Sequence, residues 1–192
     1  MAWLAVVWGP DRDAVGAVGA MSGWVRHRLD DQGPYARGNP FDLVLGGPGP
    51  APGVEWSTLG ARVLAWTVAD WRVLEVTESA SVTMVSLMRR TPAMTHDEFV
   101  THWRERHAPL ALRRHVGLVD YHQCVVTETL TPDRVDSPVP EIDGVALLGF
   151  ATRKDFEIRF FDSDEGRAEI MEDVARFMDR PGPETTLVGP PG

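Results

Sequence analysis

The chain has 192 residues, of which 43% are hydrophobic and 24% charged, enough apolar material for one large core or two small ones in a soluble protein. The net charge of −9, from 19 basic and 28 acidic residues, argues against nucleic acid or an anionic membrane surface as a partner, because both require clustered Lys and Arg. A lone cysteine, Cys124, excludes an internal disulfide, and the first apolar run is too short for a secretion signal or a membrane span, so we expect a cytoplasmic protein.

The first half of the chain alternates short apolar runs with segments rich in Gly and Pro. Residues 3–8 and 41–45 are apolar and predict two strands. Residues 11–29 carry apolar side chains at helical spacing, interrupted by three glycines, and predict a helix. Residues 61–67 predict a further strand and residues 67–76 a short helix.

The second half predicts the order β-α-β-β-α-β, which is a ferredoxin-like split βαβ unit. The expected strands are residues 82–88, 118–127, 144–151 and 185–188, and the expected helices are residues 95–107 and 162–178. Residues 130–143, rich in Pro and Asp, predict a loop between the second and third of these strands.

A short pattern occurs once in each half and suggests a duplication. It reads Thr-x-x-Asp-aromatic-x-aliphatic, with Thr67, Asp70, Trp71 and Val73 in the first copy and Thr152, Asp155, Phe156 and Ile158 in the second. We therefore expect an α+β protein made of two tandem ferredoxin-like units, a degenerate half at residues 1–80 and a second half at residues 81–192. Two such halves would pack sheet against sheet within one chain.

The helix expected at residues 95–107 has a defined start and one aromatic face. Thr95 and Glu98 have the spacing of a capping box, in which each side chain satisfies a backbone amide of the other residue. Phe99 and Trp103 lie four residues apart and share a face. These two side chains either anchor the helix on its sheet or form the wall of an apolar pocket.

His107 is the candidate for proton transfer. Pro109 disfavours the helical conformation at the residue before it, so the helix is expected to end or kink near His107. A histidine at a helix C-terminus is stabilised in its charged form by the helix dipole, and histidine is the side chain best suited to acid–base work at neutral pH. The structural alternative is a capping histidine that only binds helix carbonyls.

The strand expected at residues 118–127 has polar side chains on both faces. Alternation places Asp120, His122 and Cys124 on one face and Tyr121, Gln123 and Val125 on the other. One polar set must therefore face something other than an apolar core. Either Tyr121 donates a hydrogen bond in a pocket, or His122 lies there as a partner of His107.

Motifs for bound cofactors and metals are missing from the sequence. It has no phosphate-binding glycine loop, no Cys-x-x-Cys or His-x-x-x-His spacing and no serine nucleophile elbow. His102 and His107 are five residues apart, which on a regular α-helix places them on different faces. We expect chemistry without cofactor or metal.

The region around this helix resembles the EthD family of the dimeric α+β barrel superfamily. The residues that carry the resemblance are Arg90, Pro92, Thr95, Glu98, Phe99, Trp103 and His107-Ala108-Pro109-Leu110, then Tyr121, Gln123, Asp143-Gly144-Val145-Ala146, Phe150, Asp155-Phe156, Asp162-Ser163 and Asp173-Val174-Ala175-Arg176-Phe177. The resemblance covers residues 82–190 and leaves out the first 80. It implies ferredoxin-like units whose sheets pair into a barrel, from two chains as a homodimer or here from one chain.

The resemblance also implies a pocket for a hydrophobic small molecule between the sheet and its helices. The implied catalytic residues are His107 as the proton carrier, with Arg90 or Tyr121 steadying an enolate oxygen. Phe99, Trp103, His122 and Phe150 are the implied substrate contacts. The first reading is a cofactor-independent lyase, cyclase or isomerase acting on a polyketide-like or catabolic intermediate.

Two alternatives remain open at this point. The protein could instead be a non-enzymatic small-molecule-binding accessory protein of a monooxygenase pathway, which uses the same pocket. A further alternative, by analogy with heme-binding relatives, makes His107 an axial ligand.

Overall fold

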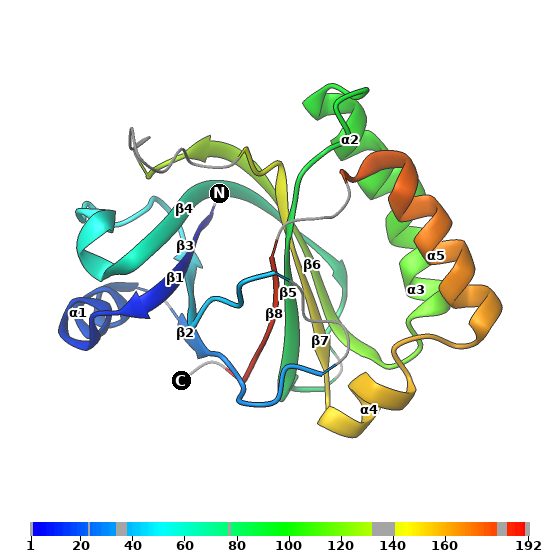
Figure 1. The fold of residues 1–192 in the computed structure, drawn as a ribbon, viewed down its shortest axis with the longest axis horizontal. Helices are drawn as coiled ribbons and strands as arrows, with labels where there is room; N and C mark the ends of the chain where they lie inside the picture. Colours follow the sequence, from blue (N-terminus) through cyan, green and yellow to red (C-terminus); the bar gives the residue numbers. More distant parts are fainter. Residues whose placement is uncertain are drawn as a thin grey trace.

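An eight-stranded antiparallel sheet curves into a nearly closed barrel in the computed structural model, with the helices on its outside (Figure 1). The structure describes residues 2–22, 24–33, 38–76, 78–131, 141–179 and 184–190. The predicted α+β fold is thereby confirmed. Most of the loop expected at 130–143 lies outside the described residues.

The strands run in the spatial order β2-β3-β1-β4-β6-β7-β5-β8. Their bounds are β1 Ala2–Pro10, β2 Trp24–His27, β3 Leu43–Pro48, β4 Gly60–Leu74, β5 Val82–Met88, β6 Leu118–Thr129, β7 Gly144–Phe150 and β8 Thr185–Val188. Numbered within each half, both halves have the strand order 2-3-1-4, which is that of a ferredoxin-like sheet. This repeated order supports the proposed duplication with a boundary between β4 and β5.

The two halves meet at two seams. The long strands β4 and β6 pair across the first seam. At the second, the chain after β2 meets β8 through the bridge of Arg28 with Val188, and the Gly189 amide donates to the His27 carbonyl at 2.8 Å. One chain therefore supplies both halves of the barrel.

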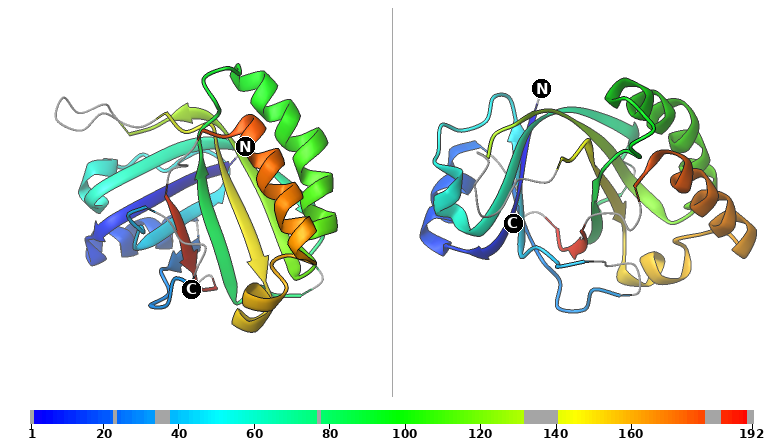
Figure 2. Two further views of the ribbon diagram at one scale, coloured as in Figure 1. Left: turned by 45° about the vertical axis from the view of Figure 1, so that its right-hand side comes forward. Right: turned by 45° about the horizontal axis from the view of Figure 1, so that its top comes forward.

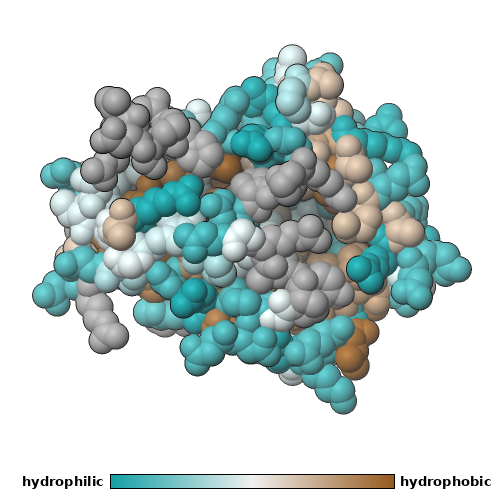
Figure 3. Space-filling model, viewed as in Figure 1, coloured by the Kyte–Doolittle hydropathy of each residue, from teal (hydrophilic) through white to brown (hydrophobic). Residues whose placement is uncertain are grey.

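The helices cover the two halves unequally (Figure 2). The first half has α1 (Arg12–Ser22) and a single 3₁₀ turn, η1 (Trp56–Leu59). The second half has a long helical segment, α2 (His96–His102), η2 (Trp103–His107) and α3 (Ala108–Arg114), beside α5 (Asp164–Phe177), with α4 (Arg153–Ile158) leading into α5. The face seen in Figure 1 is mostly hydrophilic (Figure 3). No helix among the described residues is long and apolar enough to span a lipid bilayer.

Three apolar clusters hold these layers together. One lies between the second-half sheet and its helices and includes Phe99, Trp103 and Phe177. Another lies under α1 in the first half. The third fills the inside of the barrel with side chains from both halves, among them Trp66 and Leu147. Burial of this shared cluster joins the halves into one cooperative unit.

The helix expected at residues 67–76 is wrong, because residues 67–74 belong to β4. Val68, Asp70 and Arg72 line the barrel interior while Ala69 and Val73 pack toward the helices, so the side chains alternate with a period of two. The short pattern that suggested duplication lies in β4 in its first copy but starts helix α4 in its second. That pattern therefore does not mark equivalent positions.

The helix expected at residues 11–29 is shorter than predicted. It ends at Ser22, and residues Trp24–His27 form β2, a strand that the sequence pattern did not reveal. The difference matters for function because β2 carries Arg26 into the wall of a cavity.

Candidate functional site

A cavity of about 470 Å³ lies inside the barrel, lined by β1, β2, β3 and β4 of the first half and by β5, β6 and β7 of the second. It has apolar and charged walls, the mixture typical of small-molecule sites. Its lining residues are Ala2, Trp3, Leu4, Trp24, Arg26, Gly47, Pro48, Val68, Asp70, Arg72, Thr83, Asp120, His122, Cys124 and Leu147.

Strand alternation decides which side chains reach this cavity. On β6, Asp120, His122 and Cys124 face the barrel interior, while Tyr121 and Val125 pack in the cluster beneath the helices. The expectation that one polar set faces something other than an apolar core therefore holds for the set that contains His122. In the β4–β6 register, Arg72 lies directly opposite His122.

His122 lies between two carboxylates. Its Nδ1 is 2.8 Å from Oδ1 of Asp70, and its Nε2 is 3.2 Å from Oδ1 of Asp120. Burial by itself lowers the pKa of His122, but the hydrogen bonds and charges of Asp120 and Asp70 outweigh burial and raise it to about 9. The imidazole is therefore protonated at neutral pH, with one N–H toward each carboxylate.

Arg72 gives the neutral imidazole a second partner. Its Nε lies 3.2 Å from Nε2 of His122 and 3.8 Å from Asp120. When His122 loses the Nε2 proton, that nitrogen can accept a hydrogen bond from Arg72. Both protonation states of His122 thus have partners in place, as an acid–base group requires.

Cys124 lines the same wall but is not poised as a nucleophile. Its thiol donates to Asp70 at 3.5 Å. Burial and the charge of Asp70 raise the pKa of the thiol, so it keeps its proton. Among the described residues, no three His, Cys, Asp or Glu side chains are arranged to hold a metal ion.

His107 is not at a helix end. The helical segment continues through Pro109 to Arg114, because the turn Trp103–His107 is π-helical and the amide of Ala108 donates to the carbonyl of Trp103. Pro109 then falls in the first turn of α3, where its missing amide costs little. The expected helix end, and with it the dipole argument for His107, is wrong.

The π-helical turn brings His102 and His107 together. Nε2 of His102 and Nδ1 of His107 each lie 2.9 Å from the carboxylate of Asp173 on α5. The expectation that the two histidines occupy different helix faces is wrong, since in a turn with i→i+5 bonding residues five apart are stacked on one side. Burial alone raises the pKa of Asp173, but the hydrogen bonds from His107 and His102 lower it overall.

The other predicted substrate contacts fill the core between sheet and helices. Phe99, Trp103 and Phe150 are fully buried there, and the aromatic ring of Phe99 lies 5.5 Å from that of Trp103. His122 is on the opposite face of β6 from this core, so it is not a partner of His107. Of the predicted site residues, the structure brings only His122 to the cavity.

Tyr121 is also enclosed in that core. Its hydroxyl accepts a hydrogen bond from Nε2 of Gln123 at 3.0 Å, and the same amide donates to the carbonyl of Trp103. Burial raises the pKa of Tyr121 to about 12, against the effect of the Gln123 hydrogen bond. A phenol in this state keeps its proton, and the contacts hold the helix to the sheet.

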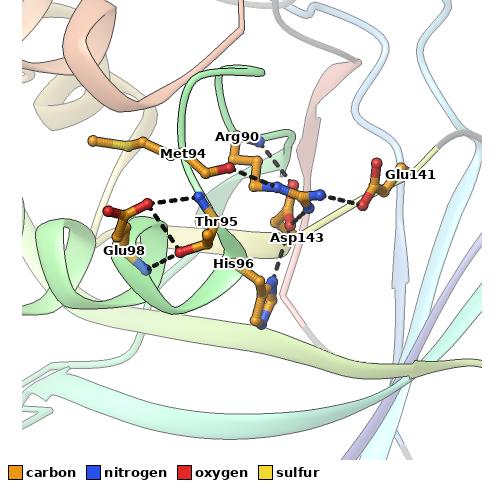
Figure 4. A network of polar contacts seen from close by, with 7 residues as sticks. All are labelled: Arg90, Met94, Thr95, His96, Glu98, Glu141 and Asp143. Carbon is orange, nitrogen blue, oxygen red and sulfur yellow. Dashed lines mark hydrogen bonds and ion pairs between the residues drawn. The ribbon is translucent and has the colours of Figure 1, made fainter.

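Arg90 belongs to a network that joins the end of β5 to the start of α2 (Figure 4). Its guanidinium pairs with Asp143 and, at 2.6 Å, with Glu141, while its Nε donates to the carbonyl of Met94 at 3.1 Å. His96 also contacts Asp143, at 2.9 Å. Each nitrogen of the guanidinium thus has a partner in the protein itself, and the contacts give Arg90 a structural role.

The sequence pattern placed Asp120 on the same strand face as His122, but it missed Asp70 and Arg72 beside His122 and Arg26 in the same cavity wall. Asp70 and Arg72 were assigned to a helix, and Arg26 to the end of another, so their place in the cavity wall was not predicted. The alternation of Val68, Asp70 and Arg72 with apolar Ala69 and Val73 was the available signal.

Comparison with known proteins agrees with the geometry of the fold. Residues 91–181 match the model of the EthD domain, within the region of the predicted resemblance. No curated protein matches the chain significantly.

Solved structures of the same fold cover nearly the whole chain. An anthrone oxidase-like protein matches with 13% identity and a TM-score of 0.61, over 97% of this chain and 90% of that one. A mutant chlorite dismutase from Candidatus Nitrospira defluvii, in complex with cyanide, matches with 10% identity and a TM-score of 0.52, over 100% of this chain and 90% of that one. Residues 91–181 thus match the EthD domain, and the chain has the fold of the dimeric α+β barrel proteins.

Proposed function

We propose that the protein is a cofactor-independent lyase, cyclase or isomerase that moves protons on a hydrophobic, oxygenated small molecule bound in the barrel cavity. The observation that carries the proposal is the position of His122, between Asp70 and Asp120 in the wall of a cavity of about 470 Å³. Perturbed titrating groups facing a cavity are typical of catalytic sites. The apolar walls, including Val68 and Leu147, would hold the body of the substrate.

In the proposed reaction, Asp120 and His122 act on neighbouring atoms of the substrate. The carboxylate of Asp120 accepts a proton from the carbon next to a carbonyl group. The imidazolium of His122 donates a proton to the carbonyl oxygen, so the C–H electron pair becomes the double bond of an enol. In an isomerisation, the proton held by Asp120 goes to a different carbon, and the enol O–H returns its proton to His122. In a dehydration, the proton held by Asp120 goes instead to a hydroxyl group on the neighbouring carbon, which leaves as water while the enol O–H returns its proton to His122.

The test is solvent hydrogen exchange, which reports enol formation whatever the later step. A panel of ketones that includes a hydroxyanthrone is incubated in D₂O, and deuterium next to the carbonyl is measured by NMR. We expect the wild type to accelerate exchange on at least one compound and His122→Gln to lower that rate by roughly a hundredfold or more. Unchanged exchange in His122→Gln would contradict the role of His122.

His107 is a second candidate for the same proton transfer, favoured by its orientation on Asp173 at 2.9 Å in a π-helical turn. Such a carboxylate–imidazole pair orients a general base in many enzymes. Its surroundings are the packed core beneath the helices, so substrate access there requires the aromatic side chains to move. In the exchange assay His107→Gln is the matched control: loss of exchange in this variant, with His122→Gln active, would assign the chemistry to His107.

A non-enzymatic binding protein of a monooxygenase pathway is the alternative function. It would use the same cavity, and its ligand would bind equally well to wild type and His122→Gln. Tight binding of a panel compound without exchange or conversion by the wild type would favour this alternative over catalysis.

A further inference from the structure

Arg26 is a cation in the cavity wall that forms no ion pair within 4 Å with a described carboxylate. Its two protein hydrogen bonds both come from Nη1, to Oγ1 of Thr83 at 3.1 Å and to the carbonyl of Gly189 at 3.2 Å. Its Nε is buried and, within the described part of the chain, has no hydrogen-bond partner. Burial lowers the pKa of Arg26, although the charge of Asp120 acts in the opposite direction.

The other charges of the cavity balance one another. Asp70 and Asp120 provide two negative charges, and protonated His122 and Arg72 provide two positive charges within 4 Å of them. Arg26 is the remaining charge. A guanidinium taken out of water without a counter-charge is costly, and a buried N–H without an acceptor adds to that cost.

The contacts of Arg26 fix the orientation of its guanidinium through Nη1 and involve neither Nε nor Nη2. Thr83 and Gly189 hold Nη1, and the indole ring of Trp24 lies 5.3 Å from the guanidinium carbon. The edge formed by Nε and Nη2 has no described protein acceptor. An arginine binds a carboxylate through two parallel N–H···O bonds, from Nε and one Nη or from both Nη groups.

We propose that Arg26 binds a carboxylate of the substrate, so that the ligand of the cavity is a hydrophobic carboxylic acid anion. The apolar body would lie against Trp24, Val68 and Leu147, and the far end of the molecule would reach His122. This inference rests on the proposed function for the location of the site and specifies the substrate class that the site takes.

The test compares two ligands of the same shape and different charge, 2-naphthoate and 2-naphthamide. Binding is followed by quenching of tryptophan fluorescence, since Trp24 lines the cavity, and by calorimetry. We expect the wild type to bind 2-naphthoate roughly tenfold to a hundredfold more tightly than the amide, the range for a hydrogen bond to a charged group. Equal binding of the two compounds by the wild type would overturn the proposal.

Two variants assign the preference to Arg26. Arg26→Gln should bind both compounds alike, and Arg26→Lys, which keeps the charge without the planar fork, should keep part of the preference. Arg28→Gln is the matched control, because Arg28 lies just after the same strand and pairs with Asp42 at 3.2 Å. A full preference in Arg26→Gln, or its loss in Arg28→Gln, would contradict the assignment.

The two proposals fail in different ways. A carboxylate preference that depends on Arg26, without any hydrogen exchange, would leave the binding site intact and remove the catalytic role of His122. Hydrogen exchange on neutral ketones without a carboxylate preference would support the catalytic role of His122 and contradict the binding of a carboxylate by Arg26.

Discussion

The charge of His122 links the cavity to the stability of the fold. Its folded-state pKa of about 9 lies above the unfolded value of 6.5, so His122 binds its proton more tightly in the native state than in the unfolded state. The stabilisation is fully present below about pH 6.5 and is lost as the pH rises toward 9. The side chain is only 16% exposed, and the shift corresponds to about 3 kcal/mol at most.

We therefore expect wild type and His122→Gln to differ in free energy of unfolding most at pH 6 and least at pH 9.5. Urea unfolding at several pH values measures the difference. Parallel curves for the two proteins across this range would show that the two carboxylates do not raise the pKa of His122.

For single residues, the sequence pattern predicted part of the candidate site and gave no clear signal for the rest. Alternation in residues 118–127 predicted that one polar set faces away from an apolar core, and His122 is in that set. The choice of His107 as proton carrier rested on Pro109 ending the helix, and a π-helical turn removes that reason. Such a turn depends on packing against α5 and Asp173, which lie far away in the sequence.

At the scale of elements, the helical segment and β7 fit each other through Trp103 and Gly144. A Cβ atom added at Gly144 would lie 2.5 Å from Cζ3 of the buried Trp103 ring, closer than any real contact. Gly144 therefore permits the close approach of the helix to the sheet, since a larger residue would push it out.

Gly144→Ala should lower the free energy of unfolding by about 1–3 kcal/mol, the usual cost of overpacking a core. Gly16→Ala is the matched control, because Gly16 is exposed in α1 and a Cβ there meets no atom within 4 Å. That control should stabilise the protein by roughly 0.5–1 kcal/mol through helix propensity. Thermal melts of the two variants measure both effects, and equal shifts would refute the close fit.

Elements with strong local signals were predicted well. The capping box of Thr95 with Glu98 is present, with the Glu98 amide donating to Oγ1 of Thr95 at 3.2 Å. The strands of the second half also lie where apolar runs placed them. The end of β4 was missed because its pairing with β6 is a long-range contact, and pairing outweighs local propensity in deciding between helix and strand.

At the scale of the whole molecule, the barrel core is shared between the halves. The second-half sheet contributes seven inward-facing residues to it: Val85, Leu87, Cys124, Val126, Val145, Leu147 and Val188. In a fragment of residues 81–192 this apolar face would be open to water, and a second copy of the fragment could cover it.

We expect the fragment 81–192 to self-associate, with a dimer as the smallest folded species, and multi-angle light scattering measures its mass. The same fragment with Leu112→Glu should associate equally, because Leu112 is exposed on the outer face of α3. Leu147→Glu should prevent association. A folded monomer of the unmodified fragment would contradict the shared core.

The duplication was predicted from a short repeated pattern that turned out to lie in a strand and in a helix. The strand order 2-3-1-4 in both halves is the better support, and order in space cannot be read from local sequence. The seam between the chain after β2 and β8 consists of one bridge and a few backbone hydrogen bonds, which leave no pattern in the sequence.

The covalent join between the halves frees the cavity from symmetry. In a homodimer every substitution appears in both chains, so a cation introduced in one wall of the barrel also appears in the symmetry-related wall. Here Arg26 comes from the first half, and His122 comes from the second. A ligand that is charged at one end and reactive at the other thus contacts two different walls. A substitution in one wall leaves the other wall unchanged, so the two can evolve independently.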